Sequence, residues 1–241
     1  DYGLDNGVLQ LSQHELGHLV TTDARTALQM AYVRNNSLHL FVLPGLICSL
    51  FLNARSIERD QLGRLVHLLY PFFQQEYFLH WADAELDATI DKVLSVLEEQ
   101  GLIHREKNSF QGAPLNSPES DLLEHLGNAV MPALERFYLT IRLLVQYGDG
   151  RLDASELEQL AHQTAHRMSL LYEFNSPEFF DKTVLRNFIQ QLQLHGLTEA
   201  DDQNKLHFNG QLTTLDEEAQ RILSPHVSQS IQRITRREEK Q

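Results

Sequence analysis

The feature that most constrains the fold is an apolar stretch from Leu38 to Leu52, in which only His39 and Ser49 are polar. A helix built from it would be apolar on every side and would have to be buried by other parts of the chain. The stretch is shorter than the roughly 20 apolar residues that cross a membrane. With the polar residues that precede it, it predicts one central helix over 32–52, kinked where Pro44 removes a backbone donor.

The composition is that of a soluble globular protein with a large core. The 241 residues are 42% apolar and 22% charged, which leaves room for one large or two ordinary domains. The net charge of −13 disfavours nucleic acid as a partner. The single cysteine, Cys48, predicts a buried thiol in a reducing compartment. Because the chain begins at Asp1 rather than Met, we expect a piece of a longer protein.

Apolar spacing predicts a mainly helical chain. Alternation at Val8–Leu11 and Leu19–Thr21 indicates a hairpin around Gly17, and Thr22 or Asp23 is a good N-cap for a helix that begins at Ala24. Two amphipathic helices and one more apolar helix follow, over 57–78, 83–100 and 129–146. We expect the helix over 129–146 to be the partner of the central apolar run. A β-flap that turns at Lys107-Asn108 follows the second amphipathic helix, and a linker covers 111–120.

The second half of the chain repeats the first. A shift of 95 residues places 57–102 on 152–197 without a gap, and seven of the 46 positions are identical. We therefore predict a mainly α fold of two tandem helical modules with small β-flaps, winged-helix-like and related by internal duplication. Two unrelated subdomains with similar helix caps remain the alternative. The predicted parts are an N-terminal hairpin and lead-in helix, two modules, and a C-terminal helical segment with a charged tail, over 1–31, 32–115, 116–210 and 211–241.

Two motifs near the N-terminus resemble catalytic patterns. His14-Glu15-Leu16-Gly17-His18 matches the zinc-protease pattern, in which two histidines one helical turn apart hold the metal and the glutamate acts as base. That chemistry needs a helix, whereas the residues here favour a polar hairpin turn, so we predict no metal site. His18 and Asp23 have the spacing of the acyltransferase His-Asp pair, but the phosphate-holding blocks of such enzymes are missing, which favours a chance match.

Other charged clusters favour surface roles. Glu158, His162 and His166 would share one helix face and could bind a metal, although an exposed polar stripe explains them as well. The helix over 82–100 carries six acidic residues against Lys92 alone, so it would be repelled by phosphates. If the modules are winged-helix-like, we therefore expect them to dock proteins rather than DNA.

Three blocks resemble bacterial membrane-bound glycerol-3-phosphate acyltransferases. Tyr32-Val33-Arg34-Asn35-Asn36-Ser37-Leu38-His39-Leu40-Phe41-Val42-Leu43-Pro44 is similar to the family's Tyr-Tyr-Arg-Asn-Asn-x-x-His-x-x-x-Leu-Pro block, with Val33 in place of the second Tyr. The stretch from Leu68 to Trp81 resembles the next block. Asn175-Ser176-Pro177-Glu178-Phe179-Phe180-Asp181-Lys182 resembles the family's Asn-Ala-Pro-Glu-Phe-Phe-Asp-Lys, with Ser176 in place of Ala. The resemblance is to the region C-terminal to the acyltransferase core.

The resemblance implies an enzyme that transfers an acyl group from acyl-CoA or acyl-carrier protein to glycerol 3-phosphate, the first step of phospholipid synthesis. It places the whole enzyme at the cytoplasmic face of the inner (plasma) membrane. The catalytic His and Asp would precede Asp1, so this chain alone should be inactive, with the upstream acyltransferase domain as its partner. No cofactor and no nucleic acid are expected, and a homodimer is left open.

The same resemblance singles out residues that could approach the substrate. Arg34 is a good phosphate ligand, with Asn35, Asn36 and His39 beside it in the sequence. Equally, the asparagines could close a helix junction and Arg34 could pair with carbonyls at its end. We expect seven further motif residues to be structural, namely Tyr32, Pro44, Pro177, Glu178, Phe179, Phe180 and Asp181. The alternatives to the acyltransferase interpretation are a free-standing winged-helix-like scaffold and a zinc hydrolase that uses His14, Glu15 and His18.

Overall fold

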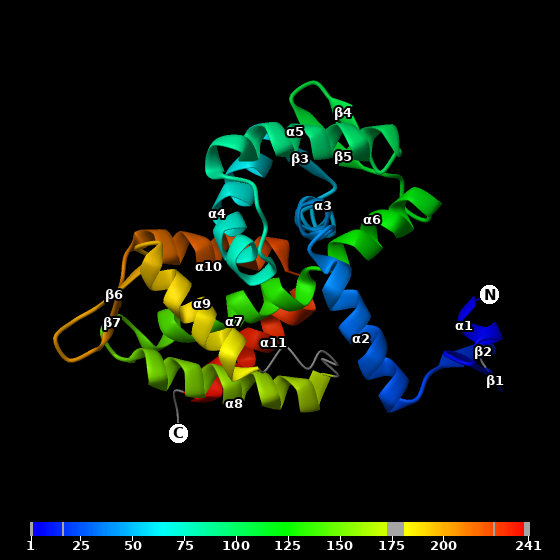
Figure 1. Cartoon of the computed structure of the whole chain (residues 1–241). Coiled ribbons are helices and arrows are strands. Elements are labelled where there is room, and N and C mark those ends of the chain that lie inside the picture. Colours follow the sequence, from blue (N-terminus) through cyan, green and yellow to red (C-terminus); the bar gives the residue numbers. More distant parts are fainter. Residues whose placement is uncertain (1, 16, 173–180, 224, 239–241) are drawn as a thin grey trace. The chain divides into compact units, whose positions relative to one another are not determined.

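The computed structural model describes residues 2–15, 17–172, 181–223 and 225–238, and they form a mainly helical protein with three small antiparallel sheets (Figure 1). The chain divides into two compact units, Asp1–Phe41 and Val42–Gln241. The mainly helical fold class is confirmed. The predicted boundaries within the chain stay a prediction.

The first unit is a hairpin followed by one long helix. Its elements are α1 (Tyr2–Asp5), β1 (Gln10–His14), β2 (Gly17–Thr21) and α2 (Ala24–Leu38). Strands β1 and β2 pair antiparallel, with Gln10 opposite Thr21 and His14 opposite Gly17. Gly17 has φ +126°, a backbone conformation that glycine adopts without strain. The hairpin and the helix that begins at Ala24 were both predicted and are confirmed.

The second unit begins with a group of helices around a three-stranded sheet. Its elements as far as residue 128 are α3 (Val42–Ser49), β3 (Ser56–Glu58), α4 (Arg59–Tyr77), α5 (Asp83–Glu99), β4 (Ile103–Glu106), β5 (Ser109–Gly112) and α6 (Pro118–Asn128). The strand order is β3-β5-β4, with both pairs antiparallel. The β-flap turns at Lys107, as predicted, in a left-handed conformation with φ +54°.

The rest of the second unit packs around one long helix. Its elements are α7 (Met131–Tyr147), α8 (Ala154–Tyr172), α9 (Lys182–Leu194), β6 (Thr198–Ala200), β7 (Leu206–Phe208), α10 (Gly210–Ile222) and α11 (Pro225–Glu238). Helix α7 contacts α8, α9, α10 and α11, and 12 of its 17 residues are buried. Stacked Phe137 and Phe188 rings, with centroids 4.4 Å apart, join α7 to α9.

The central apolar run forms two elements rather than one kinked helix. Helix α2 ends at Leu38, and α3 begins at Val42 with Pro44 in its first turn. A proline there breaks no helical hydrogen bond, because the first backbone N–H groups of a helix have no partner within it. The prediction of a single kinked helix over 32–52 is therefore wrong. The run is buried as expected: Cys48 is fully buried, and burial raises the pKa of its thiol to about 12.

Helix α3 packs mainly on α6, which the sequence did not predict, rather than on the helix over 129–146 (Figure 1). The contact is close because two glycines form it. A Cβ atom on Gly45 would lie 2.8 Å from the backbone oxygen of Leu126, and one on Gly127 would lie 3.1 Å from the Leu52 side chain. Helix α6 begins at Pro118, within the linker predicted over 111–120. Ser117 caps it, because its Oγ accepts a hydrogen bond from the N–H of Ser120.

The order strand, helix, helix, hairpin occurs twice in the second unit. In the first half it comprises β3, α4, α5 and β4-β5; in the second, an isolated bridge between Asp153 and Lys205 precedes α8, α9 and β6-β7. Helices α5 and α9 end alike, at Gly101 with φ +72° and Gly196 with φ +66°. Common descent of the two halves, and their likeness to winged helices, stay predictions.

None of the helices among residues 2–15, 17–172, 181–223 and 225–238 combines the length and the apolar character that a membrane crossing requires.

Candidate functional site

Helix α2 positions the block that the family resemblance singled out. Asp23 caps its N-terminus: Oδ1 accepts hydrogen bonds from the N–H groups of Arg25 (2.9 Å) and Thr26 (3.1 Å). The Thr26 hydroxyl donates to Oδ2 over 2.6 Å. This last bond is the main cause that lowers the pKa of Asp23, because it favours the ionised carboxylate. Asp23 is thus used as a helix cap, while His18 lies in β2 opposite Gln13.

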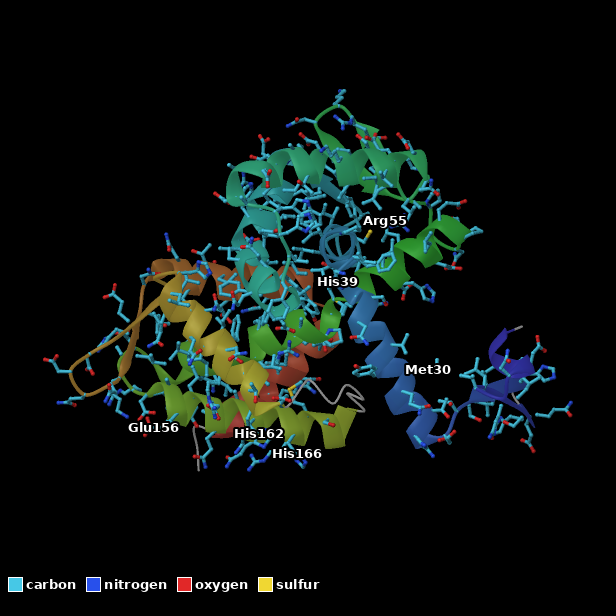
Figure 2. All side chains as sticks on the ribbon, viewed as in Figure 1. Met30, His39, Arg55, Glu156, His162 and His166 are labelled. Atoms are coloured by element: carbon cyan, nitrogen blue, oxygen red, sulfur yellow. The ribbon has the colours of Figure 1, made fainter. Side chains whose placement is uncertain are left out.

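The polar block lies within the helix rather than at a junction after it. Arg34, Asn35 and Asn36 belong to the last turns of α2, and His39 is its C-cap residue. Asn36 and His39 are exposed, and Figure 2 shows His39 at the end of the helix. Their backbone positions share one face with Tyr32, because residues three, four and seven apart lie along one side of a helix.

Arg34 stands apart from the rest of this block. At 100° per residue, its backbone position lies about 160° around the helix axis from that of Asn36. The sequence interpretation placed the asparagines beside Arg34 as extra donors. The helix instead separates two faces, one with Arg34 and one with Asn36 and His39.

The end of the first unit also exposes several large apolar side chains. Tyr32 is 71% exposed, Val33 65% and Leu40 63%, and Met30 and Phe41 are about half exposed. Figure 2 shows Met30 as a side chain on α2. Several exposed large apolar side chains near one helix end are typical of a region that contacts another protein surface.

The zinc-protease pattern does not form a zinc site. His14 ends β1 and His18 lies in β2, so the two histidines are on opposite strands of a hairpin and not one turn apart on a helix. Among the described residues, no group of three or more His, Cys, Asp and Glu side chains could hold a metal ion. The zinc hydrolase alternative lacks the helix on which its chemistry depends.

The polar stripe on α8 includes an ion pair. Glu158 accepts hydrogen bonds from Arg186 Nε over 2.7 Å and from Nη2 over 3.0 Å. The bond from Arg186 is the main cause that lowers the pKa of Glu158. His162 and His166 follow it along α8 (Figure 2). Glu158 thus joins α8 to α9.

The third family block is only partly within the described residues. Pro177, Glu178, Phe179 and Phe180 lie outside them. Asp181 is described and caps α9, because its Oδ1 accepts hydrogen bonds from the N–H groups of Thr183 (2.7 Å) and Val184 (3.3 Å). In the second block, Tyr70 and Gln74 both donate to the backbone oxygen of Trp81, over 3.0 and 2.8 Å, and so close the loop after α4. Pro44 lies in the first turn of α3.

One His–carboxylate cluster was missed at the sequence level because its members are far apart in the chain. His207 Nδ1 lies 2.8 Å from Asp149, and Nε2 lies 3.3 Å from Asp201. The hydrogen bond with Asp149 is the main cause that raises the pKa of His207. Because each ring nitrogen lies near a carboxylate, the His207 ring favours its protonated form. In that form neither nitrogen can accept a proton from a substrate.

Two neighbouring charges on α7 were also missed. Arg136 is 1% exposed and forms an ion pair with Glu76 on α4. Glu135 is 8% exposed, and burial raises the pKa of its carboxyl to about 8. The sequence carried a signal for both, because Glu135 and Arg136 are adjacent charges within a mostly apolar helix.

Known proteins match nearly the whole chain. Residues 2–201 match the family described as the glycerol-3-phosphate acyltransferase C-terminal region. The glycerol-3-phosphate acyltransferase of Pseudomonas putida (strain GB-1) is 41% identical over 220 residues, which are 91% of this chain and 27% of that protein. Those of Pseudomonas entomophila (strain L48) and Pseudomonas aeruginosa (strain UCBPP-PA14) are each 39% identical, over 96% and 97% of this chain and 28% of their own length. The chain thus spans little more than a quarter of these relatives. The chain belongs to the glycerol-3-phosphate acyltransferase family and corresponds to the C-terminal region of its members.

Proposed function

We propose that the complete protein transfers a fatty acyl group from acyl-CoA or acyl-carrier protein to the 1-hydroxyl of glycerol 3-phosphate, and that this chain braces its acyltransferase domain. The proposal rests on one observation: relatives named glycerol-3-phosphate acyltransferase match 91–97% of this chain with 27–28% of their own length. The other three quarters would contain the catalytic histidine and aspartate. The enzyme would work at the cytoplasmic face of the inner membrane.

The exposed end of α2 is the surface through which this chain would meet that domain. It combines apolar side chains with a polar face that includes Asn36 and His39, a mixture that suits a contact next to a polar substrate site. The Arg34 position, on the other face of the helix, offers a bidentate phosphate ligand. A helix in this place could stabilise the fold of the domain and also complete its substrate site.

Separately expressed parts of the enzyme test the bracing role. We expect acyl transfer to glycerol 3-phosphate when this chain is added to the catalytic part, and little or none from either alone. Full activity of the catalytic part by itself would refute the role. No activity from the intact enzyme would refute the proposed reaction.

Substitution of Arg34 in the complete enzyme tests the substrate contact. Loss of a bidentate phosphate contact typically weakens binding by about 1.5–3 kcal/mol, so Arg34→Ala should raise the KM for glycerol 3-phosphate by about tenfold or more. Arg34→Lys should recover only part of the loss, because an ammonium group cannot form the planar fork.

Arg25→Ala is the matched control, because Arg25 is an exposed arginine in the first turn of the same helix. It should leave both kcat and KM unchanged. If Arg34→Ala also left both unchanged, Arg34 would not contact the substrate.

A further inference from the structure

A cavity of about 430 Å³ opens in the second unit between the segment that follows α3, at residues 51–53, and helices α6, α7 and α11. This volume is in the range of small-molecule sites in proteins. Much of its wall is apolar and comes from Phe51, Leu52, Leu123, Met131 and Val227. Its polar groups include the carboxyls of Glu124 and Glu135, while none of the described residues that line it is Lys, Arg or His.

Glu135 is the unusual group in this cavity. Glu135 is 8% exposed, and no hydrogen bond or ion pair joins its carboxyl to another described residue, so burial alone raises its pKa. Asp216, another buried acid that contacts α7, differs because its Oδ2 accepts a hydrogen bond from Arg142 over 2.9 Å, although its Oδ1 is buried without a partner among the described residues. A buried carboxyl without a partner is costly, because it must either keep its proton or find a positive charge.

We propose that this cavity binds a primary ammonium group carried on a short apolar stem, with the Glu135 carboxylate as its counter-ion. The apolar walls would bury the stem, at about 0.8 kcal/mol for each CH₂ group. Glu124 on α6, which is exposed, adds negative charge at the cavity and disfavours anions such as phosphates. A free alkylamine and a lysine side chain from the rest of the longer protein carry the same chemistry.

Binding of a cation must release a proton from Glu135. In the free protein the carboxyl is mainly neutral below its pKa of about 8, and the ammonium group binds the ionised form. Each pH unit below 8 therefore weakens cation binding about tenfold. A neutral alcohol behaves in the opposite way, because its oxygen accepts a hydrogen bond from the protonated carboxyl. Glu124 is the only other titratable group among the described residues of the wall.

Calorimetric titrations of this chain with hexylamine and 1-hexanol, between pH 6 and 9, test the proposal. We expect the affinity for hexylamine to rise up to tenfold per pH unit and to level off near pH 8, with close to one proton released per molecule bound at pH 6.5. The affinity for 1-hexanol should fall above pH 8. Equal, pH-independent binding of the two probes, or binding of neither, would overturn the proposal.

Glu135→Gln keeps the size of the side chain but removes its charge. It should weaken hexylamine binding at pH 8 at least tenfold, abolish proton release, and leave 1-hexanol binding within about threefold. Glu124→Gln is the matched control, because Glu124 lines the same cavity but is exposed, and it should change hexylamine affinity less than threefold. The proton release of the unaltered chain is a separate readout that does not require any variant to fold.

The longer protein distinguishes the two sources of the ammonium group. If a lysine of the upstream part occupies the cavity, a zero-length carbodiimide cross-link should join it to Glu135, and hexylamine should no longer bind. If the ligand is a free amine, hexylamine should bind the longer protein as it binds this chain. If the longer protein showed no cross-link to Glu135 and also did not bind hexylamine, the proposal would be contradicted.

Discussion

At the scale of single residues, Glu135 and Arg136 show how position on one helix decides the state of a charge. Arg136 meets Glu76 on α4, so its charge is buried together with an opposite one. Glu135, one residue earlier, faces a cavity with both apolar and polar walls, and burial raises its pKa to about 8, so that it keeps its proton at neutral pH. The two residues thus affect stability in different ways.

Glu135→Gln should make the chain more stable at alkaline pH. The pKa of Glu135 is raised from 4.5 to about 8 in the folded state, so the stability from its neutral form is complete below pH 4.5 and is lost as the pH rises to 8. Glutamine does not ionise. The free energy of unfolding of the variant, relative to the unaltered chain, should therefore increase by up to about 4 kcal/mol between pH 5 and 8 in urea titrations. A constant difference would show that Glu135 ionises normally.

The His207 cluster should produce a pH dependence near neutrality. The pKa of His207 is raised by Asp149 and Asp201, so the stability it contributes is complete below pH 6.5 and is lost as the pH rises through the folded-state pKa. An NMR titration of the His207 ring should give a pKa above 6.5. Asp149→Asn should lower it, while Asp202→Asn, at an exposed neighbour, should change it little. A pKa at or below 6.5 would contradict the cluster.

Residues that act within one element were the most predictable from the sequence. Thr22 or Asp23 was expected as a helix cap, and Asp23 is the cap. His14 and His18 were expected in a hairpin, which is confirmed. Clusters such as Asp149, Asp201 and His207 were not found, because nothing in the sequence shows that residues 58 positions apart will meet.

At the scale of elements, the α3–α6 contact depends on glycine. Gly45 lets the backbone of α6 approach so closely that any Cβ atom would meet the Leu126 oxygen. Protein interiors are closely packed, so two helices in such close contact have little room to move against each other.

Gly45→Ala should destabilise the second unit. The new Cβ would lie 2.8 Å from Leu126 O and 3.0 Å from Val130 Cγ1, and such overpacking typically costs about 1–3 kcal/mol. Gly210→Ala is the matched control, because no atom lies within 4 Å of a Cβ there and α10 begins at this residue. It should be neutral or slightly stabilising. Equal free energies of unfolding for the two variants would refute the close contact.

Apolar spacing predicted α4 and α5 well, since both are amphipathic helices with one buried stripe. It failed for α3, because a run that is apolar on all sides has no period from which to read its ends. It also missed α6, because Ser117-Pro118 is typical both of a turn and of a helix start.

At the scale of the whole molecule, almost all of the described core belongs to the second unit. Leu38 is the only buried apolar residue described in the first unit, whereas Val42 begins a long series of buried residues. The family, and the place of the chain in the C-terminal region of its members, could be predicted from short blocks of sequence. The contacts proposed for the α2 block could not, because this sequence spans little more than a quarter of its relatives' length.

Removal of residues 1–41 should leave the second unit folded. A fragment over 42–241 retains the core from Val42 onward, so we expect one cooperative thermal transition with Tm within about 5 °C of the full chain. A fragment over 32–241, cut at the boundary that the sequence predicted, should behave similarly. Loss of the cooperative transition in both fragments would show that the first unit is part of the core.

The exposed end of α2 has a consequence for how assembly could be observed. Helix α2 has 15 residues, and Leu38 is the only buried one among its described side chains, so the helix is marginal by its own propensity and its backbone amides should exchange with solvent deuterium quickly in the isolated chain. Any surface that covers Tyr32 and Val33 would slow that exchange. The amides of α2 would then report, peptide by peptide, when the enzyme has come together.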